Sequence, residues 1–281
     1  MRKAFYFYAN PYQHGSMTAA RALQAKLLPL GAMVCAPEWM RAQGVGAKDA
    51  DGEKISAAVA FGGDGTLLRL APEAARRGWP MLGVHTGTVG FLMQGDADKP
   101  GETAALLMRD VYPLECHAML RVACSKGDYL ALNDVSITRG EHPGVIAVKA
   151  EADGERVYTL HGDGVLLSTP LGATAYALAA GGPIVRPDLQ CLSIVPLCAR
   201  EPLARAVMLP STARVAFSVE GSPRRRLQLA VDGQTLLPIE APETVQAALS
   251  DIQARLIVSR RSFFATLRQK QRVWSEEEEQ E

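Results

Sequence analysis

The feature that most constrains the fold is a buried strand followed by a glycine loop and a helix. Residues 55–61 are small, β-branched or apolar, which is typical of a buried strand, and a helical pattern covers Thr66 to Arg77. Between them stands Gly62-Gly63-Asp64-Gly65. Glycine permits tight turns, and the free N–H groups at a helix start favour phosphate. An aspartate there repels an anion unless metal or chemistry is involved, so we interpret the loop as a phosphoryl-transfer site centred on Asp64.

Strands and helices alternate around this loop. Alternation of this kind predicts a parallel sheet in a Rossmann-like α/β domain, with ligands beyond the carboxyl ends of the strands. We expect Ser16 to cap the first helix and Pro72 to kink or break the helix after the loop. We place this domain at residues 1–113, with strands expected at 3–9, 33–36, 55–61 and 81–84 and helices from 16, 66–77 and 102–109.

A second glycine-spaced turn, His85 to Leu92, follows the strand at 81–84. It has two interpretations. It can be a tight loop between a strand and a helix, or it can form the opposite wall of the same cleft as the first glycine loop. Arg69, one turn into the helix, is either a solvated side chain or a phosphate contact.

The second half of the chain has a different pattern. Short runs rich in Val, Ile, Leu and Thr alternate with Gly, Asp, Asn and Pro, which predicts antiparallel β structure. We therefore expect an α/β plus β architecture, in which a β-rich, β-sandwich domain spans 114–258. The tail from about 259 to 281 is expected to contain a basic helix, followed by solvated acidic residues, and to pack back on the first domain.

Composition narrows the function classes. The 281 residues carry 30 basic and 30 acidic side chains, so global charge gives no support for a nucleic-acid partner. No stretch approaches the ~20 apolar residues that span a bilayer, and the amino end lacks a signal-peptide cleavage site, so we expect a cytoplasmic protein. Five cysteines, an odd number without C-x-x-C spacing, argue against zinc or a disulfide framework.

Two stretches of the β-rich half are chemically dense. Asn133-Asp134 is either a turn pair bonded to its own backbone or a pair that binds ribose hydroxyls or a base. Residues 163–183 read as a strand, a Pro/Gly turn, a short helix over Thr174 to Ala180 and a Gly-Gly-Pro stop. This stretch is either a crossover helix that caps the domain or a site for a nucleotide's sugar or phosphate.

Taken together, these segments resemble the NAD kinase family. The glycine loop alone is shared with diacylglycerol-type lipid kinases and phosphofructokinases, whereas the block from Thr169 to Pro183 is far more specific to NAD kinases. The resemblance runs in order from about residue 55 to 235 and comprises Gly62–Thr66, Leu82–Leu92, Asn133-Asp134, Asp163–Pro183 and Asp232–Gln234.

The resemblance implies an enzyme that transfers the terminal phosphate of ATP, or of polyphosphate, to the 2′-hydroxyl of NAD's adenosine ribose, making NADP. It implies an active site between the two domains, a homodimer or homotetramer, small-molecule partners, and Mg²⁺ carried with the phosphoryl donor rather than by protein ligands. Asp64 matches the catalytic aspartate. The candidate substrate-binding residues are Gly63, Gly65, Thr66 and Arg69 in the first domain and Asn133, Asp134, His161, Asp163, Thr174, Ala175, Tyr176, Ala177, Leu178, Ala179 and Gln234 in the second.

The chain departs from the family pattern at several positions. His85 stands where the family has asparagine, Asp134 where it has glutamate, and His161 where it has arginine. Leu171-Gly172-Ala173-Thr174 lacks two of the family's hydroxyls, and the family's Pro-His-Ser motif has no clear counterpart in residues 196–202. Two other functions therefore stay open: a lipid kinase that shares the glycine loop, and a non-catalytic sensor of NAD(P).

Overall fold

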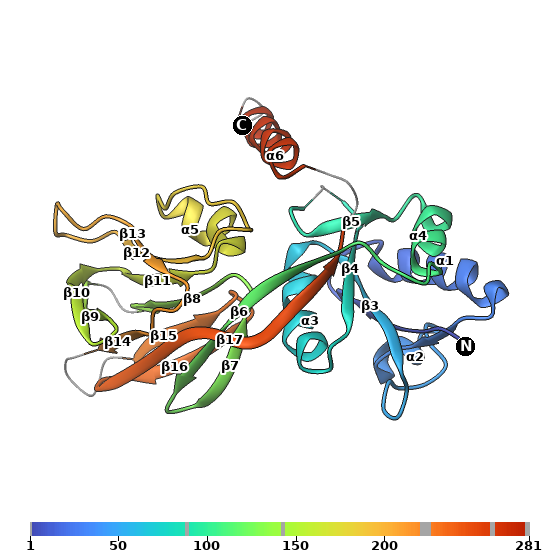
Figure 1. The fold of residues 1–281 in the computed structure, drawn as a ribbon, viewed down its shortest axis with the longest axis horizontal. Coiled ribbons are helices and arrows are strands. Elements are labelled where there is room, and N and C mark those ends of the chain that lie inside the picture. The colour runs from blue at the N-terminus through green and yellow to red at the C-terminus, as the bar shows by residue number, and fades with distance from the viewer. Residues whose placement is uncertain (1, 88–89, 142–143, 220–225, 259–261, 279–281) are drawn as a thin grey trace. The chain divides into compact units, whose positions relative to one another are not determined.

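The computed structural model describes residues 2–87, 90–141, 144–219, 226–258 and 262–278 (Figure 1). The chain divides into two compact units, one of Met1–Cys116 with Arg255–Glu281 and one of His117–Ala254. The first of these divisions lies between Cys116 and His117.

The first unit contains a parallel sheet, as the alternation of strands and helices predicted. Its strand order is β4-β3-β1-β2, and all of these pairs are parallel. Strand β5 and the end of β17 both pair with β4, also in parallel. The strands are β1 (Ala4–Ala9), β2 (Met33–Cys35), β3 (Ile55–Gly62), β4 (Pro80–His85), β5 (Met93–Asp96) and β17 (Glu243–Ile257).

Helices α1 and α3 pack on the sheet of the first unit (Figure 1). Helix α1 packs on β1, β3 and α4, and α3 packs on β3 and β4. Phe7 and Phe61 meet edge to face in the core, with ring centroids 4.8 Å apart. The helices are α1 (Ser16–Leu27), the 3₁₀ turn η1 (Leu28–Leu30), α2 (Glu38–Arg41), α3 (Asp64–Arg76), α4 (Pro100–Leu107) and α6 (Phe263–Glu278).

Two local predictions for the first unit need correction. Ser16 does not cap α1, because Gly15 takes the capping position in a left-handed conformation and Ser16 lies in the first turn. Pro72 does not break α3, which continues to Arg76, and a kink at this residue stays a prediction. The apolar face of α3 is buried, and this burial offsets the loss of one backbone hydrogen bond at a proline.

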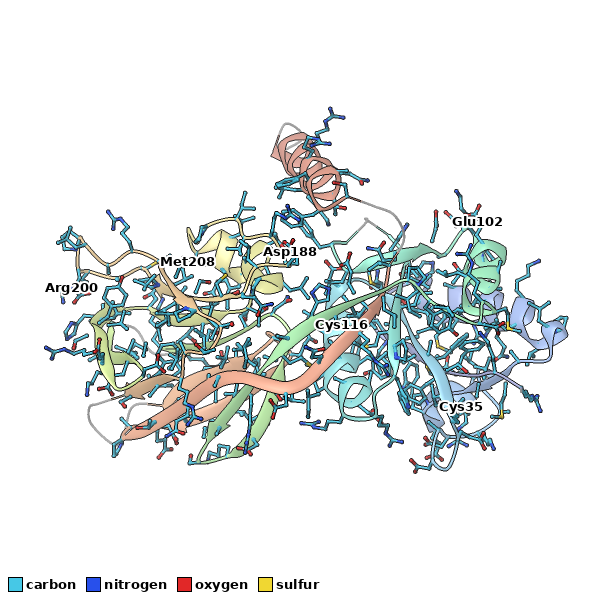
Figure 2. All side chains as sticks on the ribbon, viewed as in Figure 1. Cys35, Glu102, Cys116, Asp188, Arg200 and Met208 are labelled. Atoms are coloured by element: carbon cyan, nitrogen blue, oxygen red, sulfur yellow. The ribbon has the colours of Figure 1, made fainter. Side chains whose placement is uncertain are left out.

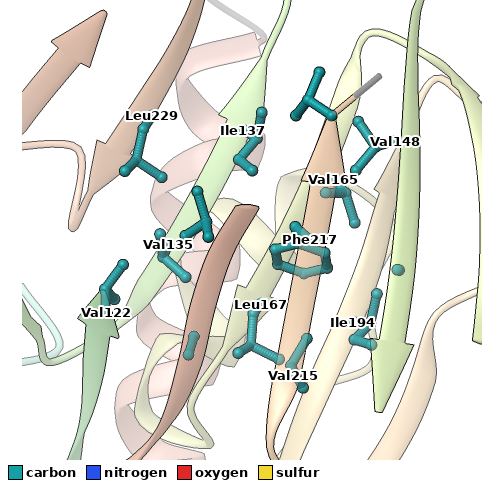
Figure 3. Close-up of a cluster of buried hydrophobic side chains, with 14 of the residues drawn as sticks. Val122, Val135, Ile137, Val148, Val165, Leu167, Ile194, Val215, Phe217 and Leu229 are labelled. Atoms are coloured by element: carbon teal, nitrogen blue, oxygen red, sulfur yellow. The ribbon is translucent and has the colours of Figure 1, made fainter. Parts of the chain in front are cut away.

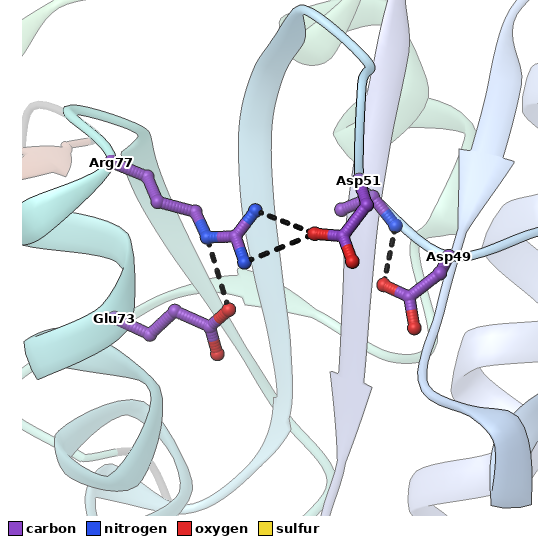
Figure 4. A network of polar contacts seen from close by, with 5 residues as sticks. Asp49, Asp51, Glu73 and Arg77 are labelled. Atoms are coloured by element: carbon purple, nitrogen blue, oxygen red, sulfur yellow. Dashed lines mark hydrogen bonds and ion pairs between the residues drawn. The ribbon is translucent and has the colours of Figure 1, made fainter.

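The carboxyl end of α3 carries a network of ion pairs (Figure 4). The Arg77 guanidinium lies 3.2 Å from Glu73 one turn earlier and 3.2 Å from Asp51, which precedes β3. The Asp49 carboxylate accepts the backbone N–H of Ala50 at 2.6 Å. Exposed pairs of this kind contribute little stability. They connect the carboxyl end of α3, which is remote from the glycine loop, to the segment before β3.

The second unit is a β-sandwich, as predicted. One sheet has the order β13-β12-β11-β8-β15-β16, and the facing strands run in the order β10-β9-β14-β17, with β6 pairing β17 and β7. The pairs of the six-stranded sheet, those along β10-β9-β14-β17 and the pair β6–β7 are antiparallel. The strands are β6 (Leu114–Cys124), β7 (Gly127–Ala131), β8 (Asp134–Thr138), β9 (Ile146–Ala152), β10 (Glu155–Gly162), β11 (Gly164–Ser168), β12 (Cys191–Leu197), β13 (Val207–Pro210), β14 (Val215–Val219), β15 (Arg226–Val231) and β16 (Thr235–Glu240).

Alternating side chains from both sheets fill the core of the second unit (Figure 3). Val135 and Ile137 of β8 and Val165 and Leu167 of β11 point to the same core as Phe217 of β14. Side chains two residues apart share one face of a strand, so this period fixes the register. Asp134 and Ser136, which alternate with Val135 and Ile137 along β8, belong to its opposite face.

A short helical segment lies against that opposite face of the six-stranded sheet. Ala177 packs with Leu166 of β11 and Val195 of β12. The predicted helix over Thr174 to Ala180 is shorter than expected, because Ala175 has a non-helical backbone (φ −103°, ψ −130°). The segment is instead a 3₁₀ turn, η2 (Leu171–Thr174), followed by one turn of α-helix, α5 (Tyr176–Ala179).

The five cysteines lie in the described part of the chain and are free thiols. Cys35 is buried in the first unit, whereas Cys116 is exposed (Figure 2). Among the described residues, no helix has the length and apolar character needed to cross a membrane.

Candidate functional site

The glycine loop of the first unit has a geometry that only glycine allows at its first position. Gly62 has a φ of 151°, and a Cβ there would lie 2.3 Å from Thr66 Oγ1. Gly63 is the residue before α3, with an extended backbone, and it accepts the N–H of Thr66 at 2.9 Å. The Thr66 hydroxyl is buried and has no hydrogen-bond partner among the described atoms. A buried hydroxyl of this kind is suited to a ligand that approaches the loop.

Asp64, the first residue of α3, is fixed by the second glycine turn. Its Oδ2 accepts the backbone N–H of Phe91 at 2.9 Å, and its Oδ1 accepts that of Leu92 at 3.0 Å. A carboxylate has about four acceptor positions, so two bonds leave room for another donor. Burial raises the pKa of Asp64, while the Leu92 and Phe91 bonds and the charge of Lys270 lower it. The result is an oriented carboxylate that can accept a further hydroxyl proton.

The second glycine turn approaches the first so closely that a side chain would not fit. A Cβ on Gly90 would lie 1.9 Å from Asp64 Oδ1. The N–H of Thr86 donates to Gly62 O at 3.3 Å. Residues 88 and 89 of this turn lie outside the described residues. Strand β5 follows this turn, so the interpretation as a loop between a strand and a helix is wrong. Residues of the second turn contact the carboxylate of Asp64, which belongs to the first glycine loop.

Gly65 and Arg69 lie in the first turns of α3. Gly65 stands between Asp64 and Thr66 and is partly buried, while Arg69 is exposed. The amino end of α3, with Gly63 before it and Gly65 in its first turn, provides backbone N–H groups of the kind that suit an anion.

In the second unit, Asn133 and Asp134 lie at the start of β8 and are buried. Their backbone N–H groups do not bond to their own side chains, as an ordinary turn pair would. They donate instead to the carboxylate of Asp232, which also accepts the N–H of Leu132. The side-chain Oδ1 of Asn133 is buried without a hydrogen-bond partner among the described atoms. This amide oxygen can therefore accept a ligand's N–H or O–H group.

The turn after β11 forms hydrogen bonds with the carbonyl groups of Leu132 and Asn133, whose N–H groups bond to Asp232. Thr169 donates its N–H to Asn133 O at 2.8 Å and its hydroxyl to Leu132 O at 2.7 Å. The N–H of Gly172 donates to Thr169 Oγ1 at 3.1 Å, and a Cβ on Gly172 would lie 2.2 Å from Asn133 O. The two chemically dense stretches of this unit are therefore packed directly on each other.

The surroundings of Asp134 and Asp232 raise the pKa of both carboxyls. Burial, and then the charge of Asp232, raises the pKa of Asp134 to about 7. Burial raises the pKa of Asp232 to about 6 against the effect of its three N–H bonds. Burial also raises the pKa of Tyr176, with smaller contributions from Cys198, Asp134 and Asp163. Perturbed carboxyls beside an unpartnered amide mark a functional site.

Two of the candidate residues make polar contacts with neighbouring side chains. His161 Nδ1 lies 2.8 Å from Glu201 Oε1, and the Glu201 carboxylate also accepts the His161 backbone N–H. These bonds lower the pKa of Glu201. Asp163 lies between β10 and β11 and pairs with Arg139 at 2.9 Å. A ligand that contacts His161 or Asp163 would compete with Glu201 or Arg139, whereas the Asn133 Oδ1 has no hydrogen-bond partner among the described atoms.

The remaining candidates lie on η2, on α5 and in the turn between β15 and β16. Thr174 Oγ1 donates to Leu171 O at 3.4 Å, at the end of η2. Tyr176 is 47% exposed, so its ring can contact a ligand. Gln234 ends the β15–β16 turn, and its N–H donates to Val231 O at 3.0 Å. Ala177 is buried, while Ala175 and Leu178 are partly buried and Ala179 is exposed.

Family models match both units. The ATP-NAD kinase N-terminal domain matches residues 33–112, and the ATP-NAD kinase C-terminal domain matches residues 132–259. Together they cover more than half of the chain. The chain belongs to the NAD kinase family.

Curated members of the family support this assignment. The chain is 37% identical over 218 residues to the NAD kinase of Heliobacterium modesticaldum, covering 75% of this chain and 77% of that one. It is 35% identical over 225 residues to the NAD kinase of Aromatoleum aromaticum, covering 78% and 74%. NAD kinases are phosphotransferases, which agrees with the phosphoryl-transfer site inferred from the glycine loop.

Two solved structures share the fold. Yeast NADH kinase complexed with NADH superposes with a TM-score of 0.82 at 18% identity, covering 93% of this chain and 85% of that one. An NAD kinase from Archaeoglobus fulgidus in complex with ATP gives a TM-score of 0.73 at 24% identity, covering 97% and 99%. An α/β domain followed by a β-rich domain is therefore the NAD kinase fold, as the sequence predicted.

Three residues that shape the two groups stand in the segments of the family resemblance but were not among the candidate site residues. Gly90 leaves space for the Asp64 carboxylate, Thr169 bonds the segment before β8, and Asp232 bonds it from the opposite side. Asp232-Gly233 was a visible signal, because Asp-Gly between two apolar runs is typical of a hairpin turn. Its contact with Leu132 carries no signal in the sequence.

Proposed function

We infer that the chain transfers the terminal phosphate of ATP to the 2′-hydroxyl of NAD's adenosine ribose, making NADP. Membership of the NAD kinase family carries this conclusion. The fixed Asp64 carboxylate supports it, because phosphoryl transfer is mostly positioning and charge stabilisation. In this proposal Asp64 orients the attacking hydroxyl and accepts its proton.

The other candidate residues receive roles in binding. The N–H groups around Gly63 and Gly65 would bind phosphate, with the Thr66 hydroxyl as a further partner and Arg69 as an outer cation. We assign the ribose and base of NAD to Asn133 and Asp134, and we propose that NAD also contacts His161, Asp163, Gln234 and Thr174 through Ala179.

We propose that Mg²⁺ enters with ATP. The part of the chain that the structure describes contains no group of three or more His, Cys, Asp or Glu side chains that could hold a metal ion. A divalent ion bound to the phosphates offsets their charge without such a group. The family resemblance also supports a homodimer or homotetramer, which light scattering would test.

The proposed function is tested by incubating the purified protein with NAD, ATP and Mg²⁺. An NADP-specific dehydrogenase then reports the product as NADPH. We expect steady NADPH production that requires both substrates. Phosphorylation of extracted diacylglycerol without NADP formation would favour the lipid kinase, and NAD binding without turnover would favour a sensor.

We expect Gly90→Ala to lower kcat by about 100-fold. The added Cβ displaces the Asp64 carboxylate, so the N–H groups of Phe91 and Leu92 can no longer orient it. Steady-state kinetics with the coupled assay measure the loss. Gly101→Ala is the matched control, because nothing lies within 4 Å of its added Cβ. Turnover of Gly90→Ala within threefold of the control would show that Asp64's orientation does not matter.

A further inference from the structure

Asp232 makes a set of contacts that its place in a hairpin turn does not require. Its Oδ2 accepts the backbone N–H of Leu132 at 2.7 Å, and its Oδ1 accepts those of Asn133 at 2.7 Å and Asp134 at 3.1 Å. Its own N–H donates to Asp134 O at 2.9 Å. The side chain is 7% exposed and bonds to residues about 100 positions earlier in the chain. One carboxylate therefore accepts three successive amides of the segment that precedes β8.

The backbone at Asp232 is arranged to make these bonds. Asp232 has a φ of 53° and Gly233 a φ of 62°, the two positive values of a type I′ hairpin turn. Strands β15 and β8 are paired neighbours, with Val231 opposite Val135, so the turn meets the start of β8. Asp-Gly is a favoured pair for this turn, so the hairpin brings the Asp232 carboxylate to the start of β8 in an ordinary backbone conformation.

The segment is bonded on both sides. Asp232 accepts its N–H groups, while Thr169 donates to its carbonyls at Leu132 and Asn133. Hydrogen bonds therefore hold the backbone of Asn133 and Asp134 from both sides, although Asn133 precedes the first residue of β8. Asn133 Oδ1 stays without a partner among the described atoms while the backbone around it is fully bonded. The site thus presents an oriented acceptor in a rigid frame.

We propose that Asp232 is a positioning residue for NAD: its carboxylate fixes the backbone that presents the side chains of Asn133 and Asp134. This role rests on the proposed function, because it assigns those two side chains to the dinucleotide. Asp232 also places a negative charge beside Asp134, and this charge contributes to the raised pKa of the Asp134 carboxyl. Asp232 therefore affects both the geometry and the ionisation of its neighbour.

The test compares Asp232→Asn with Asp153→Asn at pH 8. Asp153 is the matched control, because it also has a positive φ, precedes a glycine in a turn and accepts a backbone N–H, that of Arg214. An amide in place of the Asp232 carboxylate turns an N–H₂ group toward one of the three N–H donors, so one of these hydrogen bonds is lost. We therefore expect the KM for NAD to rise by about 10- to 100-fold. The KM for ATP is expected to stay within threefold.

A second readout separates positioning from general stability. With the neighbouring charge removed, the pH at which the KM for NAD changes should move to lower pH in Asp232→Asn. It should stay in place in Asp153→Asn. Equal increases in the KM for NAD and for ATP, or a KM for NAD equal to that of the control, would overturn the proposal. A wild-type protein that makes no NADP would instead contradict the proposed function.

Asp232→Glu keeps the test decisive if the asparagine variant does not fold. Glutamate retains the charge and the acceptors but shifts the bonded segment by one methylene. We expect a raised KM for NAD with the pH profile unchanged. An unchanged KM for NAD in this variant would show that the reach of Asp232 does not set the position of Asn133, and the proposal would fail.

Discussion

Asp64→Asn is expected to lower kcat for NADP formation by about 10² to 10⁴, the range that general acid–base groups contribute. The amide is a far weaker proton acceptor, and its N–H₂ group faces one of the two backbone donors at Phe91 and Leu92. The KM for NAD should stay within a few fold, because Asp64 acts on the reacting hydroxyl rather than on the dinucleotide as a whole. Steady-state kinetics and calorimetric titration with NAD measure the two quantities.

The control for this variant is Asp49→Asn. Asp49 also accepts a backbone N–H, that of Ala50, and lies before β3, whereas Asp64 follows it. It should retain wild-type turnover. An Asp64→Asn protein with turnover within threefold of this control would rule out the catalytic role of Asp64.

Asp134→Asn is expected to stabilise the ligand-free protein while weakening NAD binding. The pKa of Asp134 is raised from 3.8 to about 7 by burial and by Asp232, so the folded state favours the neutral form. Stability is therefore lost as pH rises from the ordinary aspartate pKa of 3.8 to about 7, and the loss is complete by pH 8. An asparagine stays neutral at every pH and does not cause this loss of stability. Urea unfolding should therefore show a larger free energy of unfolding than wild type at pH 8 and a similar one at pH 4.

The same substitution should raise the KM for NAD by about 10- to 100-fold, because a neutral amide replaces a charged acceptor for the ribose hydroxyls. Stability and substrate binding thus make opposite demands on this carboxyl. Asp251→Asn, at an exposed position of β17, should change neither quantity. A stability difference that does not vary with pH would show that ionisation of Asp134 is not its cause.

The parts of the fold that could be predicted from sequence depend on local patterns. The strand at 55–61, the glycine loop and the helix after it follow from short-range periodicity and backbone chemistry, and the structure has them as β3 and α3. Alternation in the second half predicted a β-sandwich for the same reason. Strand β5 was not among the expected strands, because Met93-Gln94-Gly95-Asp96 lacks the β-branched and aromatic residues that favour strands.

The candidate site could be predicted only in part. Asp64, Asn133 and Asp134 stand in recognisable motifs, so their residue types could be identified from the sequence. The groups that orient them could not, because Phe91 and Leu92 act through backbone N–H groups that any residue carries. Asp232 reaches its partners through the pairing of β8 with β15, a contact between distant parts of the chain.

The most direct test of the central claim compares NAD with an analogue that has hydrogen in place of the adenosine 2′-hydroxyl. Each is incubated with the wild-type protein, Mg²⁺ and ATP labelled in its terminal phosphate, and transfer of label to the dinucleotide is measured. We expect NAD to be labelled and the analogue to bind without being labelled. Equal labelling of the analogue would place the acceptor elsewhere and contradict the proposed reaction.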